Sequence, residues 1–409
     1  WLVEDPSLPI VSANFLFPSG AATDPDGKAG LANMVASLVD EGAGDLDSQA
    51  FQGRLLNQSI TLTFSASHDS FSGRLKTLSR NRDEAFDMLR LAVTQPRFDP
   101  DAVERIRAQI QAGLAARIKN PGRIAQQTFR ESMYGDHPYS RPVSGTTESV
   151  AAITETDLRR FVTRRLARNE LIIGVVGDVT VAELGPLLDT AFGDLPERAE
   201  AFNIPRAKPS TAGELIVVER DNPQSQVIFG QPGIYRDDPD YYAATILNHV
   251  LGGSGFTSRL YDEVREKRGL AYSVFSYLLP LQRAALWVGG AGTENAAVGQ
   301  SIDLIRGQWA HAQEFAISQE ELDAAKANLI GSFGLRFDNT AAIAGTLVGV
   351  QFRDLGIDFL NRRNNLIEAV TLEDVQRVAK KILDPAALTV VVVGKPEGVA
   401  ATRTITDGG

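Results

Sequence analysis

Hydrophobic positions near the N-terminus recur at the spacing of a helix. Residues 30–44 read GLANMVASLVDEGAG, and their apolar side chains fall three and four residues apart. This period predicts a helix over residues 29–40 with one buried face. The opposite face offers only small or neutral polar side chains. The apolar stripe consists of Leu31, Met34, Val35, Leu38 and Val39, and the opposite face of Asn33, Ala36 and Ser37.

The rest of the hydrophobic pattern predicts two runs of strands and helices in the same order. Such a long repeat indicates a duplicated domain and not a solenoid of short units. The first run has strands at 10–17, 59–67 and 70–78 and helices at 48–57, 81–94 and 99–119. The second run has strands at 214–219, 225–231, 271–279 and 284–292 and helices at 239–251, 257–267, 294–313 and 318–333.

A direct match within the sequence supports the duplication. Residues 154–178 align without a gap to residues 371–395, and eight positions are identical. In both stretches a threonine at the N-cap position precedes an amphipathic helix, and a β-branched strand ending in glycine follows. Strands grouped apart from helices favour mixed or antiparallel sheets with helices packed on them. The sequence therefore predicts an α+β fold of two similar domains, at residues 1–200 and 214–409, with a linker at 201–213.

Composition narrows the possible partners. The chain has 409 residues, of which 43% are hydrophobic and 22% charged, as in ordinary globular proteins. Its formal net charge of −10 is opposite to the basic footprint of a nucleic-acid-binding protein. No apolar run reaches the roughly 18–20 residues that cross a bilayer. We therefore expect no nucleic-acid partner and no membrane span.

The chain contains no cysteine, which excludes disulfides, thiolate nucleophiles and thiolate zinc sites. Its first residue is Trp1, so we expect that an upstream segment has been removed, either a secretory leader or a part trimmed from the expressed chain. A bacterial periplasm is slightly favoured over the cytoplasm on this ground.

Two candidate chemistries receive little support. The four histidines are not spaced three to five residues apart, so no helical histidine pair exists and each is expected to be structural or exposed. Residues 251–260 read LGGSGFTSRL, which lacks the Lys-Ser/Thr ending of a phosphate-binding loop. This stretch is either a helix-to-helix turn that needs positive φ angles, or a loop whose bare backbone faces a ligand.

The stretch after this turn carries the most specific pattern. Residues 258–272 read SRLYDEVREKRGLAY, with Arg265 near the end of a short helix and Tyr272 opening the next strand. A purely structural explanation is available, in which Arg265 interacts with the helix C-terminus and Tyr272 packs in a sheet. The residues alone leave both explanations open.

The run S-R-L-Y-x-x-x-R-x-x-x-G-x-A-Y after a G-G-S-G turn resembles the second-half signature of the pitrilysin/insulinase family of zinc metallopeptidases. The resemblance is strongest to the short-chain branch that includes the mitochondrial processing peptidase, and it covers the whole chain. Active members carry G-x-A-H-x-x-E-H where this chain reads GLANMVAS. The positions of the two zinc-binding histidines and the general-base glutamate are here Asn33, Ala36 and Ser37, and the third ligand falls near Gly113.

The resemblance implies a half-clamshell subunit that binds no metal itself. Imidazole and carboxylate ligands are missing at all of these positions, and their replacements are poor zinc ligands. Arg265 would hold a substrate carbonyl, and Tyr272 would donate a hydrogen bond to the oxyanion. The glycines Gly252, Gly253 and Gly255 would line the peptide path.

We therefore expect a non-catalytic, substrate-binding subunit of a heterodimeric zinc endopeptidase. Its partner would be an H-x-x-E-H subunit of similar size that holds the zinc, and its substrates extended peptides. Two alternatives remain: an inactive scaffold subunit, as some family members are, and a homodimeric protein that binds peptides without cutting them.

Overall fold

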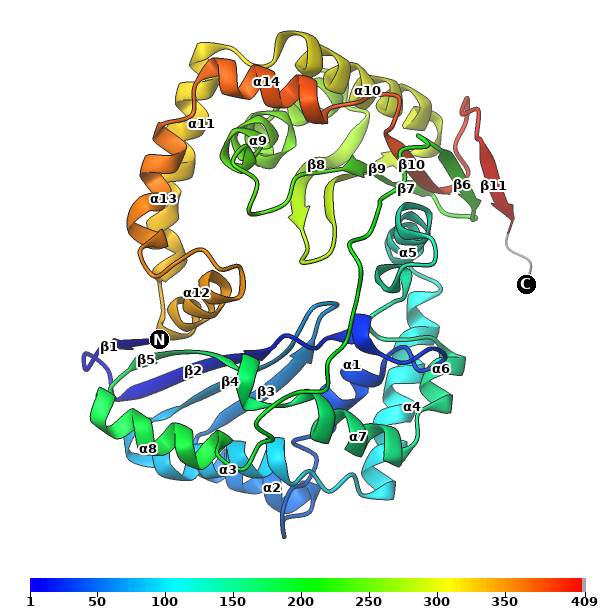
Figure 1. Ribbon diagram of the computed structural model, residues 1–409. Helices are drawn as coiled ribbons and strands as arrows, with labels where there is room; N and C mark the ends of the chain where they lie inside the picture. Colours follow the sequence, from blue (N-terminus) through cyan, green and yellow to red (C-terminus); the bar gives the residue numbers. More distant parts are fainter. Residues whose placement is uncertain (407–409) are drawn as a thin grey trace. The chain divides into compact units, whose positions relative to one another are not determined.

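The computed structural model of the chain describes residues 1–406. These residues form two compact units, each built around one sheet (Figure 1). Unit 1 consists of Trp1–Ala115, Arg141–Ile204 and Gly334–Phe359. Unit 2 consists of Ala116–Ser140, Pro205–Phe333 and the chain from Leu360 onward.

Unit 1 contains a five-stranded sheet in the order β1-β5-β2-β4-β3, in which β1 and β5 are parallel and all other neighbours antiparallel. Its strands are β1 (Leu2–Glu4), β2 (Ile10–Phe17), β3 (Thr61–Ala66), β4 (Phe71–Leu78) and β5 (Ile172–Gly177). Its helices are α1 (Leu31–Ala36), α2 (Ser48–Asn57), α3 (Arg82–Thr94), α4 (Pro100–Arg117), α6 (Thr147–Ala152), α7 (Glu155–Arg165), α8 (Val181–Phe192) and α12 (Thr340–Phe352).

Unit 2 contains a six-stranded sheet in the order β11-β6-β10-β7-β9-β8, in which β11, β6 and β10 are parallel and the remaining neighbours antiparallel. The two mixed sheets with packed helices confirm the predicted α+β class. The strands are β6 (Leu215–Glu219), β7 (Gln224–Pro232), β8 (Ala271–Pro280), β9 (Ala285–Glu294), β10 (Thr389–Gly394) and β11 (Arg403–Thr406). The helices are α5 (Pro121–Tyr134), α9 (Tyr241–Asn248), α10 (Val298–Phe315), α11 (Gln319–Gly331), α13 (Phe359–Glu368) and α14 (Leu372–Ile382).

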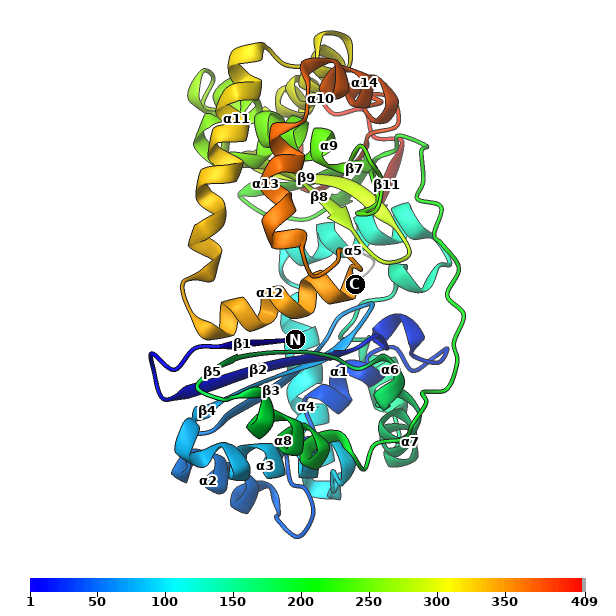
Figure 2. The same ribbon diagram turned by 60° about the vertical axis from the view of Figure 1, so that its left-hand side comes forward.

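Each sheet receives one helix from the other half of the sequence. Helix α12 packs on β5 and β2 of unit 1, where Figure 2 shows it lying across the strands, and α5 packs on β10 and β7 of unit 2. The close approach of α12 requires glycine, because a Cβ at Gly174 would lie 2.7 Å from the Ala344 carbonyl oxygen. The two units therefore depart from the contiguous ranges 1–200 and 214–409 at these two helices.

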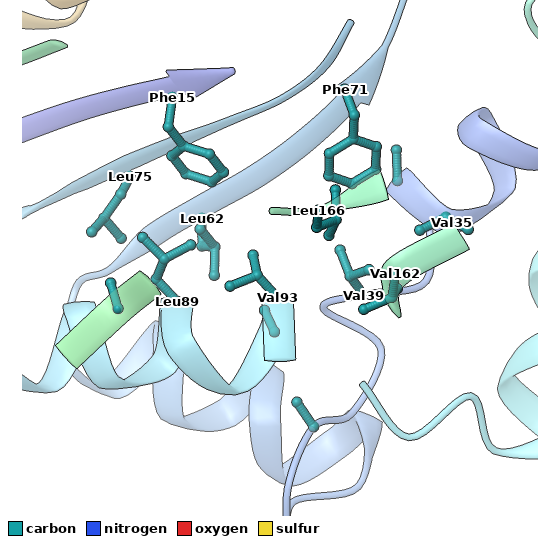
Figure 3. Packing of buried hydrophobic residues seen from close by; sticks show 14 of the residues in the cluster. Phe15, Val35, Val39, Leu62, Phe71, Leu75, Leu89, Val93, Val162 and Leu166 are labelled. Carbon is teal, nitrogen blue, oxygen red and sulfur yellow. The ribbon is translucent and has the colours of Figure 1, made fainter. Parts of the chain in front are cut away.

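The apolar stripe of the predicted 29–40 helix belongs to the core of unit 1. Val35 and Val39 point toward Val162 and Leu166 beneath Phe71 (Figure 3). The regular helix is shorter than predicted, since α1 ends at Ala36 and the chain continues to residue 40 in tight turns. Packing, and not helix length, holds this segment in place.

The two helices predicted around the glycine-rich turn, at 239–251 and 257–267, are α-helical only in part. Helix α9 ends at Asn248 and continues as a π-helical turn, η5 (His249–Gly253). After the turn the chain forms a second π-helical segment, η7 (Tyr261–Glu266). Such wider turns are rare and occur often at functional sites.

Candidate functional site

The face of α1 opposite its apolar stripe carries little chemistry. Asn33 and Ser37 are half-buried and Ala36 is buried. The Ser37 hydroxyl donates a hydrogen bond of 3.0 Å to the carbonyl oxygen of Asn33, one turn back along the helix. Gly113 lies exposed on α4. These four positions bring no imidazole, carboxylate or thiolate group to the region.

Residues 1–406 contain no group of three or more His, Cys, Asp or Glu side chains that could hold a metal ion. The histidines instead have separate local contacts. His68 Nε2 lies 3.1 Å from the carbonyl oxygen of Arg141. His137 Nε2 lies 3.0 Å from the carbonyl oxygen of Pro205. These two rings therefore bridge neighbouring segments of backbone.

Asp24 fixes the N-terminus of α1. Its two carboxylate oxygens accept hydrogen bonds from the backbone N–H groups of Gly30, at 2.9 Å, and Ala32, at 3.0 Å. Burial raises the pKa of the Asp24 carboxyl to about 7, although the N–H donors and the charge of Arg141 act in the opposite direction. The helix is thus positioned by a contact that uses none of the degenerate ligand positions.

Tyr272 is the extra residue of a β-bulge. Ala271 pairs with Thr293 and Ser273 with Gly292, so Tyr272 has no partner opposite it on β9. Bulges interrupt the alternation of side chains and redirect them, often beside active sites. Here the side chain of Tyr272 is 58% exposed. Its hydroxyl donates a hydrogen bond of 3.2 Å to the exposed carboxylate of Glu294, at the end of β9.

Arg265 lies on the π-helical segment η7, seven residues before Tyr272. Its guanidinium carbon is 4.7 Å from the centre of the Tyr261 ring, which is a cation–π contact. The side chain is half-buried, and no carboxylate is paired with it within the described part of the chain. The planar donor group of Arg265 therefore retains hydrogen-bonding capacity for a carbonyl or carboxylate.

The glycine-rich turn is partly fixed by packing. Gly252 is buried, and a Cβ there would lie 2.5 Å from the Ser276 hydroxyl oxygen of β8. Gly253 and Gly255 are exposed, and Gly255 has a φ of 63°. Close packing accounts for Gly252, against β8, and for Gly253, where a Cβ would lie 2.7 Å from the Asn248 amide nitrogen, whereas at Gly255 nothing lies within 4 Å of a Cβ.

Arg265, Tyr272 and the exposed glycines all belong to unit 2, and the degenerate positions all belong to unit 1. Within unit 2 the arrangement offers a cationic fork, a phenol and bare backbone, which together can bind a peptide main chain and donate to an anionic oxygen. The carboxylate of Glu294 lies beside the phenol. The chain thus combines a duplicated α+β fold with α1 positions that carry no imidazole or carboxylate.

Two family models match the chain. The model for insulinase (peptidase family M16) matches residues 1–147, and the model for the peptidase M16 inactive domain matches residues 152–329. The chain therefore belongs to peptidase family M16, and the resemblance deduced from residues 258–272 is confirmed.

Relatives of two kinds resemble the whole chain. The non-peptidase homolog YmxG of Helicobacter pylori is 26% identical over 391 residues, covering 95% of this chain and 90% of the relative. A probable mitochondrial-processing peptidase subunit beta of Schizosaccharomyces pombe is 25% identical over 385 residues, covering 90% and 83%. The crystal structure of a peptidase M16 inactive domain from Pseudomonas fluorescens superimposes with a TM-score of 0.90 at 29% identity, covering 98% and 96%.

The zinc ion that active members of the family bind does not fit the residues found here. An amide, a methyl group and a hydroxymethyl group replace two imidazoles and a carboxylate, and the outlying ligand position is a glycine without a side chain. None of these groups is a preferred zinc ligand. No hydrolytic step can therefore be assigned to this face of α1.

Two residues of the site were absent from the sequence analysis. Asp24 precedes α1 by seven residues, and its N–H partners become visible only when the loop is folded. Glu294 is 22 residues from Tyr272, and the antiparallel pairing of β8 and β9 brings them together. The short separation of the predicted strands 271–279 and 284–292 was the signal that could have suggested the second contact.

Proposed function

We propose that this chain is the non-catalytic, substrate-binding subunit of a heterodimeric zinc metalloendopeptidase that degrades peptides. The observation that carries the proposal is a selective loss. The zinc-binding positions are degenerate, whereas the arginine and tyrosine of the second-half signature are present as Arg265 and Tyr272. Tyr272 is largely exposed and Arg265 half-buried, so packing within unit 2 does not explain why both are there.

The proposed partner is an H-x-x-E-H protein of similar size. A shared reaction centre needs zinc, a general base and water from that subunit, because this chain supplies none of them. Zinc held by the partner would supply an activated water and polarise the peptide carbonyl. The relative from Schizosaccharomyces pombe is named as a subunit of a processing peptidase, which supports assembly as a mode of action in the family.

The roles of the two residues follow from their chemistry. The Tyr272 hydroxyl would donate to the oxyanion that forms when water attacks the peptide carbonyl. To do so it must exchange its present acceptor, Glu294, for the substrate oxygen. The guanidinium of Arg265 would hold a neighbouring backbone carbonyl and so fix the register of the peptide.

The test begins with the isolated chain and then adds the partner. The chain alone should contain no stoichiometric zinc by elemental analysis and should cleave no unstructured peptide. Co-expressed with an H-x-x-E-H protein of similar size from the same genome, it should restore or sharply raise cleavage. In that complex Tyr272→Phe should lower kcat roughly ten- to a thousandfold, the scale of one lost oxyanion donor, with zinc content unchanged. A partner that is fully active alone, or an unaltered kcat, refutes the proposal.

A proteolytically inactive scaffold or peptide-binding subunit is the second candidate. The similarity to a non-peptidase homolog over nearly the whole chain favours it. A scaffold would tolerate Tyr272→Phe and Arg265→Ala without any change in the activity of its complex. A peptide-binding protein would retain labelled peptides without a partner and release them uncut.

A further inference from the structure

Two aromatic side chains lie exposed on β8 beyond Tyr272. Phe275 is 46% and Tyr277 43% exposed. Their rings are stacked, with centroids 6.2 Å apart and planes 16° from parallel. Large apolar surfaces exposed together, unlike single exposed residues, mark sites of interaction. We call Phe275 and Tyr277 the aromatic platform.

Strand β9 leaves the surface beside the platform almost without side chains. Phe275 is paired with Gly290 and Ser273 with Gly292. The Phe275 ring lies over Gly290, where a Cβ would meet its Cζ at 3.0 Å. At Gly292 a Cβ would be only in ordinary contact with Gln226 and Ser273, at 3.5 and 3.6 Å. Gly290 and Gly292 are themselves buried, so the exposed surface here is that of the platform rings and not of the β9 backbone.

The backbone of β8 is also available. This strand is the outermost in its sheet, so one of its edges pairs with no strand of unit 2. Its ten residues, AYSVFSYLLP, include no charged side chain of the kind that usually protects an exposed edge. An extended peptide can therefore lie along β8 without desolvating a charge.

The register of the strand relates the platform to Tyr272. The bulge makes Tyr272 and Ser273 exposed in succession, after which Phe275 and Tyr277 follow on the exposed face. At about 3.3 Å per residue, Phe275 lies about 10 Å and Tyr277 about 17 Å along the strand from Tyr272. An extended peptide beside β8 covers these distances in about three and five residues.

We propose that the aromatic platform is a specificity subsite that selects an aromatic side chain three to five residues from the bond being cut. This inference rests on the proposed function, because it takes Tyr272 as the mark of the reacting carbonyl. The occupant is an extended peptide segment, since the platform continues the same exposed strand as Tyr272. The exposed, stacked ring faces match a planar side chain that stacks on or against them.

A packing role accounts for part of each side chain of the platform. An aromatic ring over a strand glycine protects that glycine, which explains Phe275 above Gly290. Tyr277 is paired with Val288, which is only 6% exposed, so part of the Tyr277 side chain covers this valine. Nearly half of each ring nevertheless stays exposed, and this exposed, stacked surface carries the proposal.

The test measures peptide preference in the complex of this chain with its H-x-x-E-H partner. The probes are unstructured 12-residue peptides of Ser, Gly and Ala with a single Phe moved one position at a time. The kcat/KM should be greatest with Phe three to five residues from the cleaved bond, by roughly three- to tenfold over the peptide with Ser there. In Phe275→Ala/Tyr277→Ala this preference should fall to about one, while Phe275→Leu, which keeps a cover on Gly290, should retain part of it.

Matched variants separate the outcomes. Phe315→Ala removes another exposed ring, on α10, and should leave the preference unchanged. An unchanged preference in Phe275→Ala/Tyr277→Ala overturns the subsite, even where Tyr272→Phe lowers kcat as expected. Loss of self-association in that variant, without loss of preference, assigns the platform to a second copy of the chain and also overturns it. If Tyr272→Phe leaves kcat unchanged, the proposed function itself is refuted, and the subsite with it.

Discussion

Replacing Asp24 by asparagine tests how the N-terminus of α1 is held. The carboxyl is 4% exposed and has a pKa of about 7, whereas an aspartate in an unfolded chain titrates near 3.8. The folded protein therefore binds one more proton than the unfolded chain between about pH 4 and 7. The stability from this proton is complete below pH 4 and is lost as the pH rises through 7.

The size of the effect follows from these two pKa values. Between pH 5 and pH 8, linkage gives a loss of about 2–3 kcal/mol in the free energy of unfolding from this one group. The amide of the Asp24→Asn variant would not titrate, but its one oxygen can accept from only one of the two N–H donors, which bond to different carboxyl oxygens in the wild type. Asp24→Asn should therefore be less stable than the wild type at pH 5 by about 1–3 kcal/mol, and should gain on it by about 2–3 kcal/mol between pH 5 and pH 8.

Urea unfolding of both proteins at pH 5, 6, 7 and 8 measures this difference. Asp26→Asn is the control, because that carboxyl is fully exposed and its ion pair with Arg141 is screened by solvent. It should give a small difference that does not vary with pH. A constant difference between wild type and Asp24→Asn over the whole range would show that Asp24 is ionised throughout, and would refute the assignment of a buried, proton-binding carboxyl.

Three other changes have defined outcomes. Gly174→Val should lower the free energy of unfolding by about 1–3 kcal/mol, because the new side chain would force α12 off the sheet. Gly113→Ala, on an open helix face, should instead raise this free energy by up to about 1 kcal/mol. Equal effects of the two substitutions in urea unfolding would contradict the packing of α12. Thr371→Ala should lower the free energy of unfolding by about 1 kcal/mol, because it removes the hydroxyl that accepts a hydrogen bond from the Asp374 N–H. An unchanged thermal midpoint would show that this cap does not stabilise the protein. In the active complex Arg265→Lys should raise KM more than it lowers kcat, since the planar fork is lost and the charge kept; the reverse pattern would place Arg265 at the reacting carbonyl.

Much of the fold could be predicted from local patterns. Strand β2 has the predicted bounds, Ile10–Phe17. The side chains of Thr154 and Thr371 each cap the N-terminus of a helix. In both helices the aspartate three residues later accepts a hydrogen bond from the backbone N–H of the threonine. These features depend on the hydrophobic period and on contacts between residues at most four positions apart, and both can be recognised in consecutive residues of the sequence. The duplication strengthened these predictions, because the same order of strands and helices was expected in both halves of the chain.

The parts that escaped prediction depend on distant segments. Helix α12 has the sequence TAAIAGTLVGVQF, which is apolar or small on all sides and shows no clear buried face. It lies in the second half of the chain but packs on β2 and β5 of unit 1, through contacts such as the 2.8 Å hydrogen bond between the hydroxyls of Ser12 and Thr340. The bulge at Tyr272 likewise arises from the pairing of β8 with β9. Neither relation leaves a local period in the sequence.

The fold makes few demands on the degenerate positions of α1 in unit 1, and few on Tyr272 in unit 2. In α1 the apolar stripe and the Asp24 contact hold the helix, so residues at the degenerate positions can change without loss of the core. The helix can thus keep its place in the fold without the catalytic residues that active relatives carry on it. In unit 2 the side chain of Tyr272 contributes little buried surface to the fold, because it is an exposed bulge residue without a partner on β9. Tyr272, like the degenerate positions of α1, can therefore change with little loss of stability.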